Sequence, residues 1–256
     1  GSRRSFRGSD FALSPCPASG ASGAGAPETM RVVFLGRAAA ASEALRRLVD
    51  RGVEVLAVVA PLPAEPLPRE YARPLLHATA QELGLPVLSA SALSEAVEGA
   101  PLQGSGKRLS DADLVLSFLF WKKIEAPLIA LPKVGCFNFH PGPLPEFRGR
   151  RGYNFAILEG FGEYGATVHW VSEEFDAGDI VEVQRFPIGP RETAFSLQQK
   201  THALLVKMLD DFIDRCLAGQ PIPRTPQGPG RSATRAELVA VRQILYQVHL
   251  VGCQKN

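Results

Sequence analysis

The sequence predicts an α/β protein with an open, mostly parallel, Rossmann-like sheet and helices on both faces. A buried strand, a helix and a second buried strand follow one another within about 30 residues from Met30, and such a unit joins parallel strands. Further short apolar runs continue the pattern along the chain. The 256 residues are 45% hydrophobic and 21% charged, which is enough to bury one sizeable core.

The first strand is predicted at residues 31–36, an apolar run that ends in glycine. A helix from Ser42 to Arg51 follows, because apolar residues recur at helical spacing between an N-cap serine and Gly52. Residues 54–60 form the second buried strand.

The next segments are shorter. Residues 61–69 contain four prolines and are expected to form a loop. A second helix over 71–83 is closed by Gly84, and 86–88 is a short strand. Residues 99–110 contain glycine and serine and are expected to be a loop.

The second half of the sheet begins with buried strands at 113–118 and 136–140. Residues 166–171 alternate like a strand with one exposed face, and 180–186 form its partner. A long amphipathic helix covers 193–217.

The domain organisation follows from composition. Residues 1–29 are rich in Ser, Ala, Gly and Pro, so we expect a disordered extension or a tag remnant, with an organelle transit peptide as the alternative. Residues 30–219 form the main domain. Residues 220–256 form a short C-terminal tail with a helix at 235–248.

Charge and cysteine usage limit the partners. The net charge of +2 argues against a nucleic-acid partner, and no apolar run approaches the roughly 20 residues of a membrane helix. Cys16, Cys136, Cys216 and Cys253 form no close pair, so neither a zinc site nor a disulfide framework is predicted. These features predict a cytoplasmic protein with incidental thiols.

The densest chemical signal surrounds Asn138 and His140. Alternate residues of a strand share one face, so both side chains point the same way near the carboxyl end of a parallel strand. Ligands bind at that edge in open α/β sheets. Prolines 141, 143 and 145 stiffen the loop that follows, which suits preorganised catalysis.

The second signal is the loop 173–179, which lies between two predicted strands. Folded back over the first site, it would bring Asp176 to His140, where a carboxylate fixes the tautomer and stabilises the imidazolium. Alone, each residue has a simpler structural explanation: a histidine at a strand end, an aspartate in a turn. Only the combined pattern favours catalysis.

The motifs identify a resemblance over about 160 residues, from Met30 to Ile188, to the N10-formyltetrahydrofolate-dependent formyltransferases. They are Asn138-x-His140-Pro-x-x-Leu-Pro145, Arg148-Gly149, Gly165-Ala-Thr-Val-His169 and Asp176-Ala-Gly-Asp179. The family fold implies that residues 30–219 are the catalytic domain. The resemblance implies that Asn138 and His140 hold the formyl oxygen and that Asp176 orients His140. Acyl transfer to an amine requires oxyanion stabilisation and an acid/base but no metal.

The resemblance also implies a folate pocket between two segments of the chain. Its expected contacts are Leu119, Phe120, Trp121, Val171, Ser172 and Phe175; for Phe120 and Trp121, packing in the core is an equal alternative. One departure is Gly142, where the family commonly has serine. It removes a hydroxyl near the formyl centre. His169 matches a recurring family histidine and is interpreted as a supporting residue.

The amine acceptor is less defined. The resemblance implies a Gly/Ser/Asn-rich phosphate-binding loop after the first strand in enzymes that act on glycinamide ribonucleotide, and the segment Gly36 to Ser42 lacks such a loop. It also implies a further C-terminal domain in enzymes that act on methionyl-tRNA, whereas 39 residues follow Leu217 here and the net charge is near neutral. Both acceptors are therefore disfavoured. We therefore expect a small-molecule amine, an amino sugar on a nucleotide carrier, with Arg148 and Arg151 binding its phosphate or carboxylate.

Other acceptors and classes stay open. An amino acid, a natural-product amine or methionyl-tRNA are the alternative acceptors. A hydrolase would pass the formyl group to water, and an inactive folate-binding module would not turn over at all. Family members often pair, so a homodimer is also predicted.

Overall fold

The computed structural model describes residues 29–61, 75–102 and 106–233. Several predictions fall outside these ranges. They concern the extension before residue 29, most of the proline-rich loop 61–69, the first turn of the helix 71–83, and the C-terminal helix 235–248.

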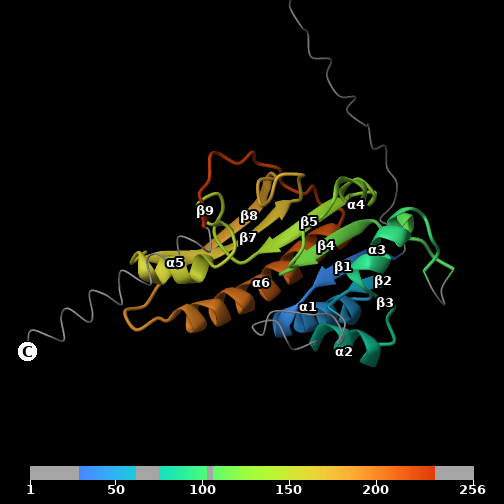
Figure 1. Ribbon diagram of the computed structural model, residues 1–256, viewed down its shortest axis with the longest axis horizontal. Coiled ribbons are helices and arrows are strands. Elements are labelled where there is room, and N and C mark those ends of the chain that lie inside the picture. Colours follow the sequence, from blue (N-terminus) through green and yellow to red (C-terminus); the bar gives the residue numbers. More distant parts are fainter. Residues whose placement is uncertain (1–28, 62–74, 103–105, 234–256) are drawn as a thin grey trace, which may run out of the picture.

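The described chain builds one seven-stranded sheet in the order β3-β2-β1-β4-β5-β7-β8, which confirms the predicted fold class (Figure 1). Its strands are β1 (Arg31–Gly36), β2 (Glu54–Val59), β3 (Val87–Leu88), β4 (Leu114–Phe118), β5 (Gly135–His140), β7 (Glu163–Trp170) and β8 (Ile180–Pro187). The first five are parallel, whereas β7 runs antiparallel to both β5 and β8. The sheet therefore reverses direction at the strand that carries Asn138 and His140.

Helices cover both faces of this sheet (Figure 1). They are α1 (Ala38–Asp50), α2 (Leu75–Glu82), α3 (Ala90–Val97), α4 (Ala126–Ile129), α5 (Gly152–Leu158) and α6 (Ala194–Leu217). Apolar residues of α1, α2 and α6 pack into one core, and those of α3 and α4 pack into a second core on the opposite face. Within the described ranges, no helix combines the length and apolarity needed to cross a membrane.

The first residues of α1 and α6 show how the local sequence determines where a helix begins. We expected Ser42 to begin the first helix, but α1 begins at Ala38, with Arg37 as an N-cap that makes no side-chain cap bond. Four consecutive alanines, the best helix formers, extend the helix back toward β1. By contrast, the helix predicted over 193–217 matches α6, and Thr193 is its N-cap, since its hydroxyl accepts from the Ser196 amide.

The prediction of an exposed face on residues 166–171 is wrong, because β7 is buried from Tyr164 to His169. Ala166 and Val168 pack into the core beneath α6. On the other face, Thr167 meets the loop after β5 and His169 meets the loop after β7. The alternation of small and polar residues in β7 is typical of a strand with one face in solvent. Here the loops after β5 and β7 cover that face instead.

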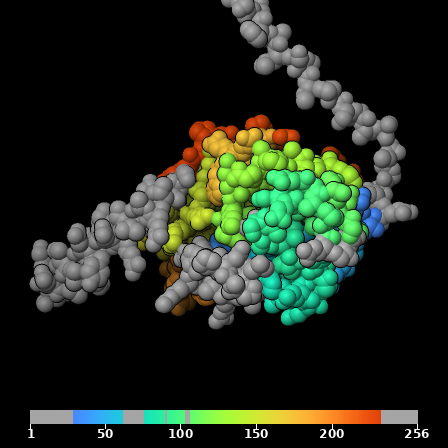
Figure 2. Space-filling model, turned by 45° about the vertical axis from the view of Figure 1, so that its right-hand side comes forward, coloured from blue at the N-terminus to red at the C-terminus, as the bar shows by residue number. Residues whose placement is uncertain are grey.

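A second, two-stranded sheet joins β6 (Arg148–Gly149) to β9 (Ser232–Ala233). It ties the last described residues to the loop that follows β5. In Figure 2 the red atoms of this C-terminal segment lie beside the orange atoms of β8, and Ile180 forms an isolated bridge with Thr225. The end of the described chain thus returns to the edge of the sheet near the predicted site.

Both cysteines in the described part of the chain are free thiols. Cys136 is buried in β5 and Cys216 is half-buried in α6. Burial raises the pKa of each thiol to about 12, so neither is a reactive thiolate at neutral pH.

Candidate functional site

The site begins at the carboxyl end of β5, where Asn138 and His140 project from the same face of the strand. Across the parallel pair β4–β5, Ser117 is the register partner of Asn138. Its hydroxyl donates to Asn138 Oδ1 at 2.7 Å. The amide oxygen is therefore held toward Ser117, and the amide nitrogen points away from it.

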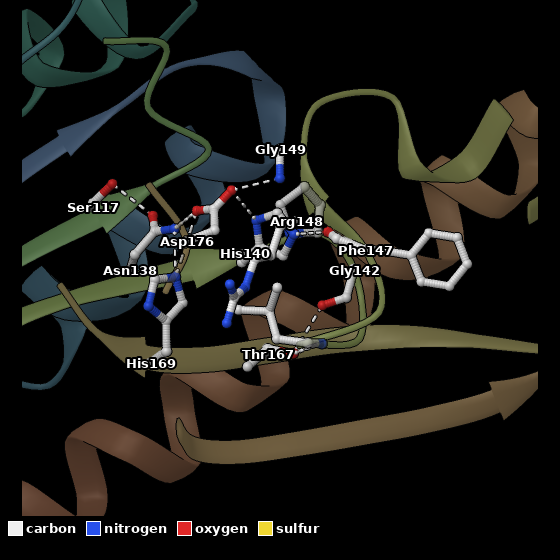
Figure 3. A network of polar contacts seen from close by, with 12 residues as sticks. Ser117, Asn138, His140, Gly142, Phe147, Arg148, Gly149, Thr167, His169 and Asp176 are labelled. Atoms are coloured by element: carbon white, nitrogen blue, oxygen red, sulfur yellow. Dashed lines mark hydrogen bonds and ion pairs between the residues drawn. The ribbon is translucent and has the colours of Figure 1, made fainter. Parts of the chain in front are cut away.

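The loop after β7 brings Asp176 onto this pair, as the sequence predicted (Figure 3). Asp176 Oδ2 lies 3.5 Å from His140 Nδ1, and Asp176 Oδ1 accepts from Asn138 Nδ2 at 3.4 Å. The backbone amide of Gly149 donates to Asp176 Oδ2 at 2.9 Å. Asp176, which lies 38 residues after Asn138, thus meets the polar pair of β5.

His169 completes the network from β7, directly opposite Asn138 in the antiparallel register. Its Nδ1 lies 2.8 Å from the Trp170 carbonyl oxygen and donates to it. Nε2 is then an acceptor, and it receives the second hydrogen bond of Asn138 Nδ2 at 3.0 Å. His169 thereby fixes the orientation of the Asn138 amide.

The protonation state of His140 follows from its surroundings. His140 Nε2 donates to the Phe147 carbonyl oxygen at 2.7 Å, which leaves Nδ1 as the basic nitrogen of the neutral ring. Burial lowers the pKa of His140 and outweighs the opposing attraction of Asp176. His140 is therefore neutral near pH 7, with its lone pair on the side of the carboxylate.

Asp176 is the permanent charge of the site. Burial alone would raise its pKa, but the nearby rings of His140 and His169 and the hydrogen bond from the Gly149 amide together lower the pKa of Asp176 to about 2. The residue is 8% exposed and has a left-handed backbone, with φ of 52°. A carboxylate in that conformation is held in place by its neighbours rather than by its own backbone preference.

The loop after β5 is fixed at several points. The Thr167 hydroxyl donates to the Gly142 carbonyl at 2.8 Å and accepts from the Leu144 amide at 3.0 Å. The Tyr164 hydroxyl donates to the Pro141 carbonyl at 2.9 Å. A Cβ at Gly142 would lie 3.2 Å from His140 Nε2, so glycine at this departure from the family pattern leaves room for the His140–Phe147 bond.

A cavity of about 470 Å³ opens beside these residues. That volume falls within the roughly 300–1,000 Å³ of typical ligand pockets. Five of the predicted folate contacts line it: Leu119, Phe120, Val171, Ser172 and Phe175. Trp121 is not among the lining residues; its ring packs on Phe120 with centroids 4.6 Å apart, and its carbonyl accepts from Arg150.

The two arginines predicted to bind the substrate, Arg148 and Arg151, differ in their position relative to the cavity. Arg151 lines the cavity. Arg148 does not, because its guanidinium donates to Gln227 Oε1 and to the Gly228 carbonyl. The cavity is also lined by polar side chains that the sequence did not single out: Arg37, Tyr153, Asn154, Gln198 and His202.

Three contributors to the network were not predicted as part of it: the Ser117 hydroxyl, the Gly149 amide and Gln227. Ser117 could have been found from the register of β4 with β5, since it occupies the position beside Asn138. Gly149 belongs to the Arg148-Gly149 motif, but its contact with Asp176 and that of Gln227 involve backbone groups that the sequence pattern does not specify. In the described ranges, no group of three or more His, Cys, Asp or Glu side chains is arranged to hold a metal ion.

Solved structures share this fold. An N-formyltransferase from Helicobacter canadensis in complex with folinic acid and dTDP-3-aminofucose has a TM-score of 0.61 and 20% identity, covering 80% of this chain and 71% of that one. Glycinamide ribonucleotide transformylase 1 from Symbiobacterium toebii has a TM-score of 0.59 and 19% identity, covering 78% and 93%. HypX from Aquifex aeolicus in complex with tetrahydrofolic acid has a TM-score of 0.57 and 21% identity, covering 82% and 30%.

Relatives found by sequence have a higher identity to this chain than these solved structures have. The methionyl-tRNA formyltransferase of Geobacter sulfurreducens is 33% identical over 193 residues, 75% of this chain and 59% of that protein. That of Geobacillus thermodenitrificans is 33% identical over 196 residues, 75% of this chain and 60% of that protein. The chain thus spans about 60% of the length of these curated relatives. A formyl transferase family model matches residues 30–213, a stretch that contains Asn138, His140 and Asp176, and the chain belongs to the formyl transferase family.

Proposed function

We propose that the protein transfers a formyl group from N10-formyltetrahydrofolate to a primary amine of a small-molecule acceptor, an amino sugar on a nucleotide carrier. The observation that carries this proposal is the meeting of Asn138, His140 and Asp176 beside the cavity, with Asp176 ionised and His140 neutral. Folate supplies the formyl carbon, and the chain supplies the groups that manage charge and protons.

His140 is the proposed base. When the amine attacks the formyl carbon, a new carbon–nitrogen bond forms, the bond to N10 breaks, and the amine loses a proton. Nδ1 is the ring nitrogen with the free lone pair, because Nε2 donates to Phe147. The Asp176 carboxylate at 3.5 Å stabilises the resulting imidazolium, which returns the proton to the leaving nitrogen.

Asn138 is the proposed oxyanion donor. Its Nδ2 makes one short bond to His169, at 3.0 Å, and one long bond to Asp176, at 3.4 Å. The hydrogen on the long side is the one that can turn to the formyl oxygen as negative charge develops there. A preorganised donor of this kind contributes about 10²–10³ in rate.

The wall of the cavity fits a folate. Leu119, Phe120, Val171 and Phe175 offer an apolar surface to a flat ring, with the backbone and Ser172 beside it. The Helicobacter canadensis protein was solved with folinic acid and HypX with tetrahydrofolic acid, which supports a folate as the formyl donor.

The polar residues that line the cavity suit a hydrophilic acceptor. Arg151 offers a charged donor for a phosphate, and Tyr153, Asn154 and Gln198 offer hydrogen bonds for hydroxyl groups. The dTDP-3-aminofucose in the Helicobacter canadensis complex supports a nucleotide-linked amino sugar over other amines.

Methionyl-tRNA is the second candidate acceptor, because the relatives that are 33% identical carry that activity in their names. An amino acid or natural-product amine, and hydrolysis to formate, are the remaining alternatives. A homodimer and a cytoplasmic location stay predictions, which size-exclusion chromatography and cell fractionation would test.

The deciding experiment incubates the full chain with N10-formyltetrahydrofolate and one acceptor at a time: dTDP-linked amino sugars, methionyl-tRNA, free amino acids, or buffer alone. Tetrahydrofolate and formate are measured separately. Tetrahydrofolate released only with an amino sugar supports the proposal. Release with methionyl-tRNA, or formate without any amine, would replace it with the corresponding alternative. His140→Ala serves as the control that removes the proposed base.

A further inference from the structure

The segment Pro223–Ala233 forms a strap across the two loops that carry the site. Thr225 and Ile180 exchange backbone hydrogen bonds of 2.7 and 2.9 Å at the start of β8. At its other end, the Arg148 amide donates to the Arg231 carbonyl at 3.0 Å, next to the pairing of β6 with β9. The strap therefore bridges the loop after β7 and the loop after β5.

Side chains at the outer end hold the strap to the sheet. Trp170 Nε1 donates to the Pro223 carbonyl at 3.0 Å. Arg224 pairs with Asp179 at 2.7 Å and lies over the Trp170 ring, 4.8 Å from its centroid. These contacts anchor the strap, and they do not involve Asn138, His140 or the Asp176 side chain.

Gln227, in the middle of the strap, uses both ends of its amide. Its Oε1 accepts from Arg148 Nε at 3.3 Å and from Arg148 Nη2 at 3.1 Å. Its Nε2 donates to the Asp176 carbonyl at 3.1 Å and also to the Gly178 carbonyl. One side chain thus joins the residue before Gly149 to the backbone of Asp176.

Asp176 requires such support. Its left-handed backbone is strained for a residue that carries a Cβ, and such a conformation persists only where the surroundings hold it. Gly149 fixes the carboxylate end, and Gln227 fixes the carbonyl end. Because Arg148 and Gly149 are adjacent, both restraints come from the same short strand, β6.

We infer that Gln227 is a positioning residue for the reaction, holding the backbone of Asp176 so that its carboxylate faces His140 Nδ1 and the Gly149 amide. The role requires an amide, since only an amide presents an acceptor to Arg148 and two donors to carbonyl oxygens. A glutamate would keep the Arg148 bond and lose both donors. This inference rests on the proposed function only for its kinetic consequence.

The test compares Gln227→Glu and Gln227→Ala with Arg224→Ala. The first variant leaves the strap attached through Arg148 and removes the hydrogen bonds to the Asp176 and Gly178 carbonyls. The second removes these bonds and those with Arg148. The control loosens the same strap at its outer end and leaves Gln227 unchanged. Circular dichroism identifies any variant that fails to fold, and the isosteric Gln227→Glu keeps the inference testable if Gln227→Ala is lost.

Two measurements follow. We expect kcat for formyl transfer to fall about tenfold to a hundredfold in both Gln227 variants, as for a catalytic group displaced by about 1 Å, with the folate KM nearly unchanged. We also expect the imidazole titration of His140, followed by NMR, to move to lower pH in Gln227→Ala. The titratable groups that face Asp176 are His140 from β5 and His169 from β7, and the charge of Arg148 lies beyond Gln227. Arg224→Ala should change neither quantity.

Full activity in both Gln227 variants, within about threefold of the parent chain, would overturn the inference, as would an unchanged His140 titration in Gln227→Ala. If the parent chain transfers formyl to no amine, the proposed function fails. The titration still decides the position of Asp176, since it needs no substrate.

Discussion

Each of the three central side chains has one defined chemical state because a neighbour holds its remaining polar atoms. Ser117 and His169 orient the Asn138 amide, Phe147 fixes the His140 tautomer, and the Gly149 amide binds the Asp176 carboxylate. Low dielectric strengthens every one of these contacts and makes any unsatisfied group costly. The hydrogen bonds of the site therefore allow few other orientations or protonation states of these three side chains.

Asp176→Asn tests the charge in this set. The amide keeps the size of the side chain but no longer stabilises an imidazolium, so we expect kcat to fall by about 10²–10⁴ while the fold persists. The pKa of His140 should fall further, since the carboxylate is the group that favours its charged form. Asp179→Asn is the matched control, because that carboxylate pairs with Arg224 instead. A loss of less than about tenfold in Asp176→Asn would remove the carboxylate from the mechanism.

His202 predicts a pH effect on stability. Burial and the nearby charge of Arg37 lower its pKa to about 4, and its Nε2 bonds with the Tyr153 hydroxyl. In the unfolded chain this histidine binds a proton below about pH 6.5, whereas in the folded protein it stays neutral down to about pH 4. Its contribution to the free energy of unfolding is therefore fully present above about pH 6.5 and is lost progressively as the pH falls toward 4. Between pH 7 and pH 4 this residue alone should lower the free energy of unfolding by about 3 kcal/mol.

Urea unfolding of the parent chain and of His202→Gln, each at pH 7 and pH 4, measures this contribution. The difference between the two proteins should shrink or reverse at pH 4, because glutamine does not titrate. A parallel decline of both proteins between pH 7 and pH 4 would show that groups other than His202 control the acid sensitivity in this range.

The sequence predicted the central residues because spacing within a strand and a family motif both converge on them. It did not predict Gln227, which lies 51 residues from Asp176 and bonds a backbone carbonyl that any residue would offer. It placed Arg148 with the substrate, since an exposed arginine next to a catalytic loop suits a phosphate. Only the folded chain shows that the guanidinium is occupied by Gln227 and Gly228.

At the scale of elements, the loop after β7 depends on a close backbone approach. A Cβ at Gly178 would lie 1.9 Å from the Trp170 carbonyl oxygen, a distance that no side chain tolerates. The loop therefore turns tightly over the end of β7, and this turn delivers Asp176 to β5. Gly178 is needed because the Trp170 backbone leaves no room for a side chain. Asp176 is needed because it brings a negative charge to His140.

Gly178→Ala should displace this loop. We expect the variant to lose most transfer activity and to unfold at lower temperature, measured by tetrahydrofolate release and by thermal denaturation. Gly162→Ala is the control: a Cβ there meets nothing within 4 Å, so both measurements should match the parent chain. Normal activity in Gly178→Ala would mean that the loop reaches the site in another conformation.

Most elements were predictable from local pattern, and the exceptions have physical reasons. The buried strands β1, β2, β4 and β5 are apolar runs with clear boundaries, and α6 has both a cap and a period. The prediction missed α3, α4 and α5; for α5, Gly152 and the left-handed Arg151 disguise its start. It missed the burial of β7, because the loops that cover Thr167 and His169 come from elsewhere in the chain.

At the scale of the whole molecule, α6 supports the site from beneath the sheet. Phe212 of α6 packs on Phe137 and Phe139, with ring centroids 4.8 and 5.7 Å away. These two phenylalanines alternate with Asn138 and His140 along β5, so one face of the strand belongs to the core and the other to the site. The position of the polar pair is therefore set by aromatic packing on the opposite side.

Phe212→Ala should destabilise the protein by about 3–5 kcal/mol, as for other large-to-small changes in a core. Denaturant unfolding gives the value. Phe195→Ala is the control, since Phe195 lies on the same helix but is 69% exposed. A loss below about 1 kcal/mol in Phe212→Ala would show that the core collapses onto the gap at little cost.

The antiparallel register of β5 with β7 has a consequence for chain length. Asn138 lies opposite His169, and His140 lies opposite Thr167. One extra residue within β7 would slide these partners apart and turn the polar side chains toward α6. The exposed turn before Glu163 carries no such constraint. Insertions should therefore be accepted at that turn and rejected two or three residues later, a contrast that a scan of inserted single residues would reveal where point substitutions would not.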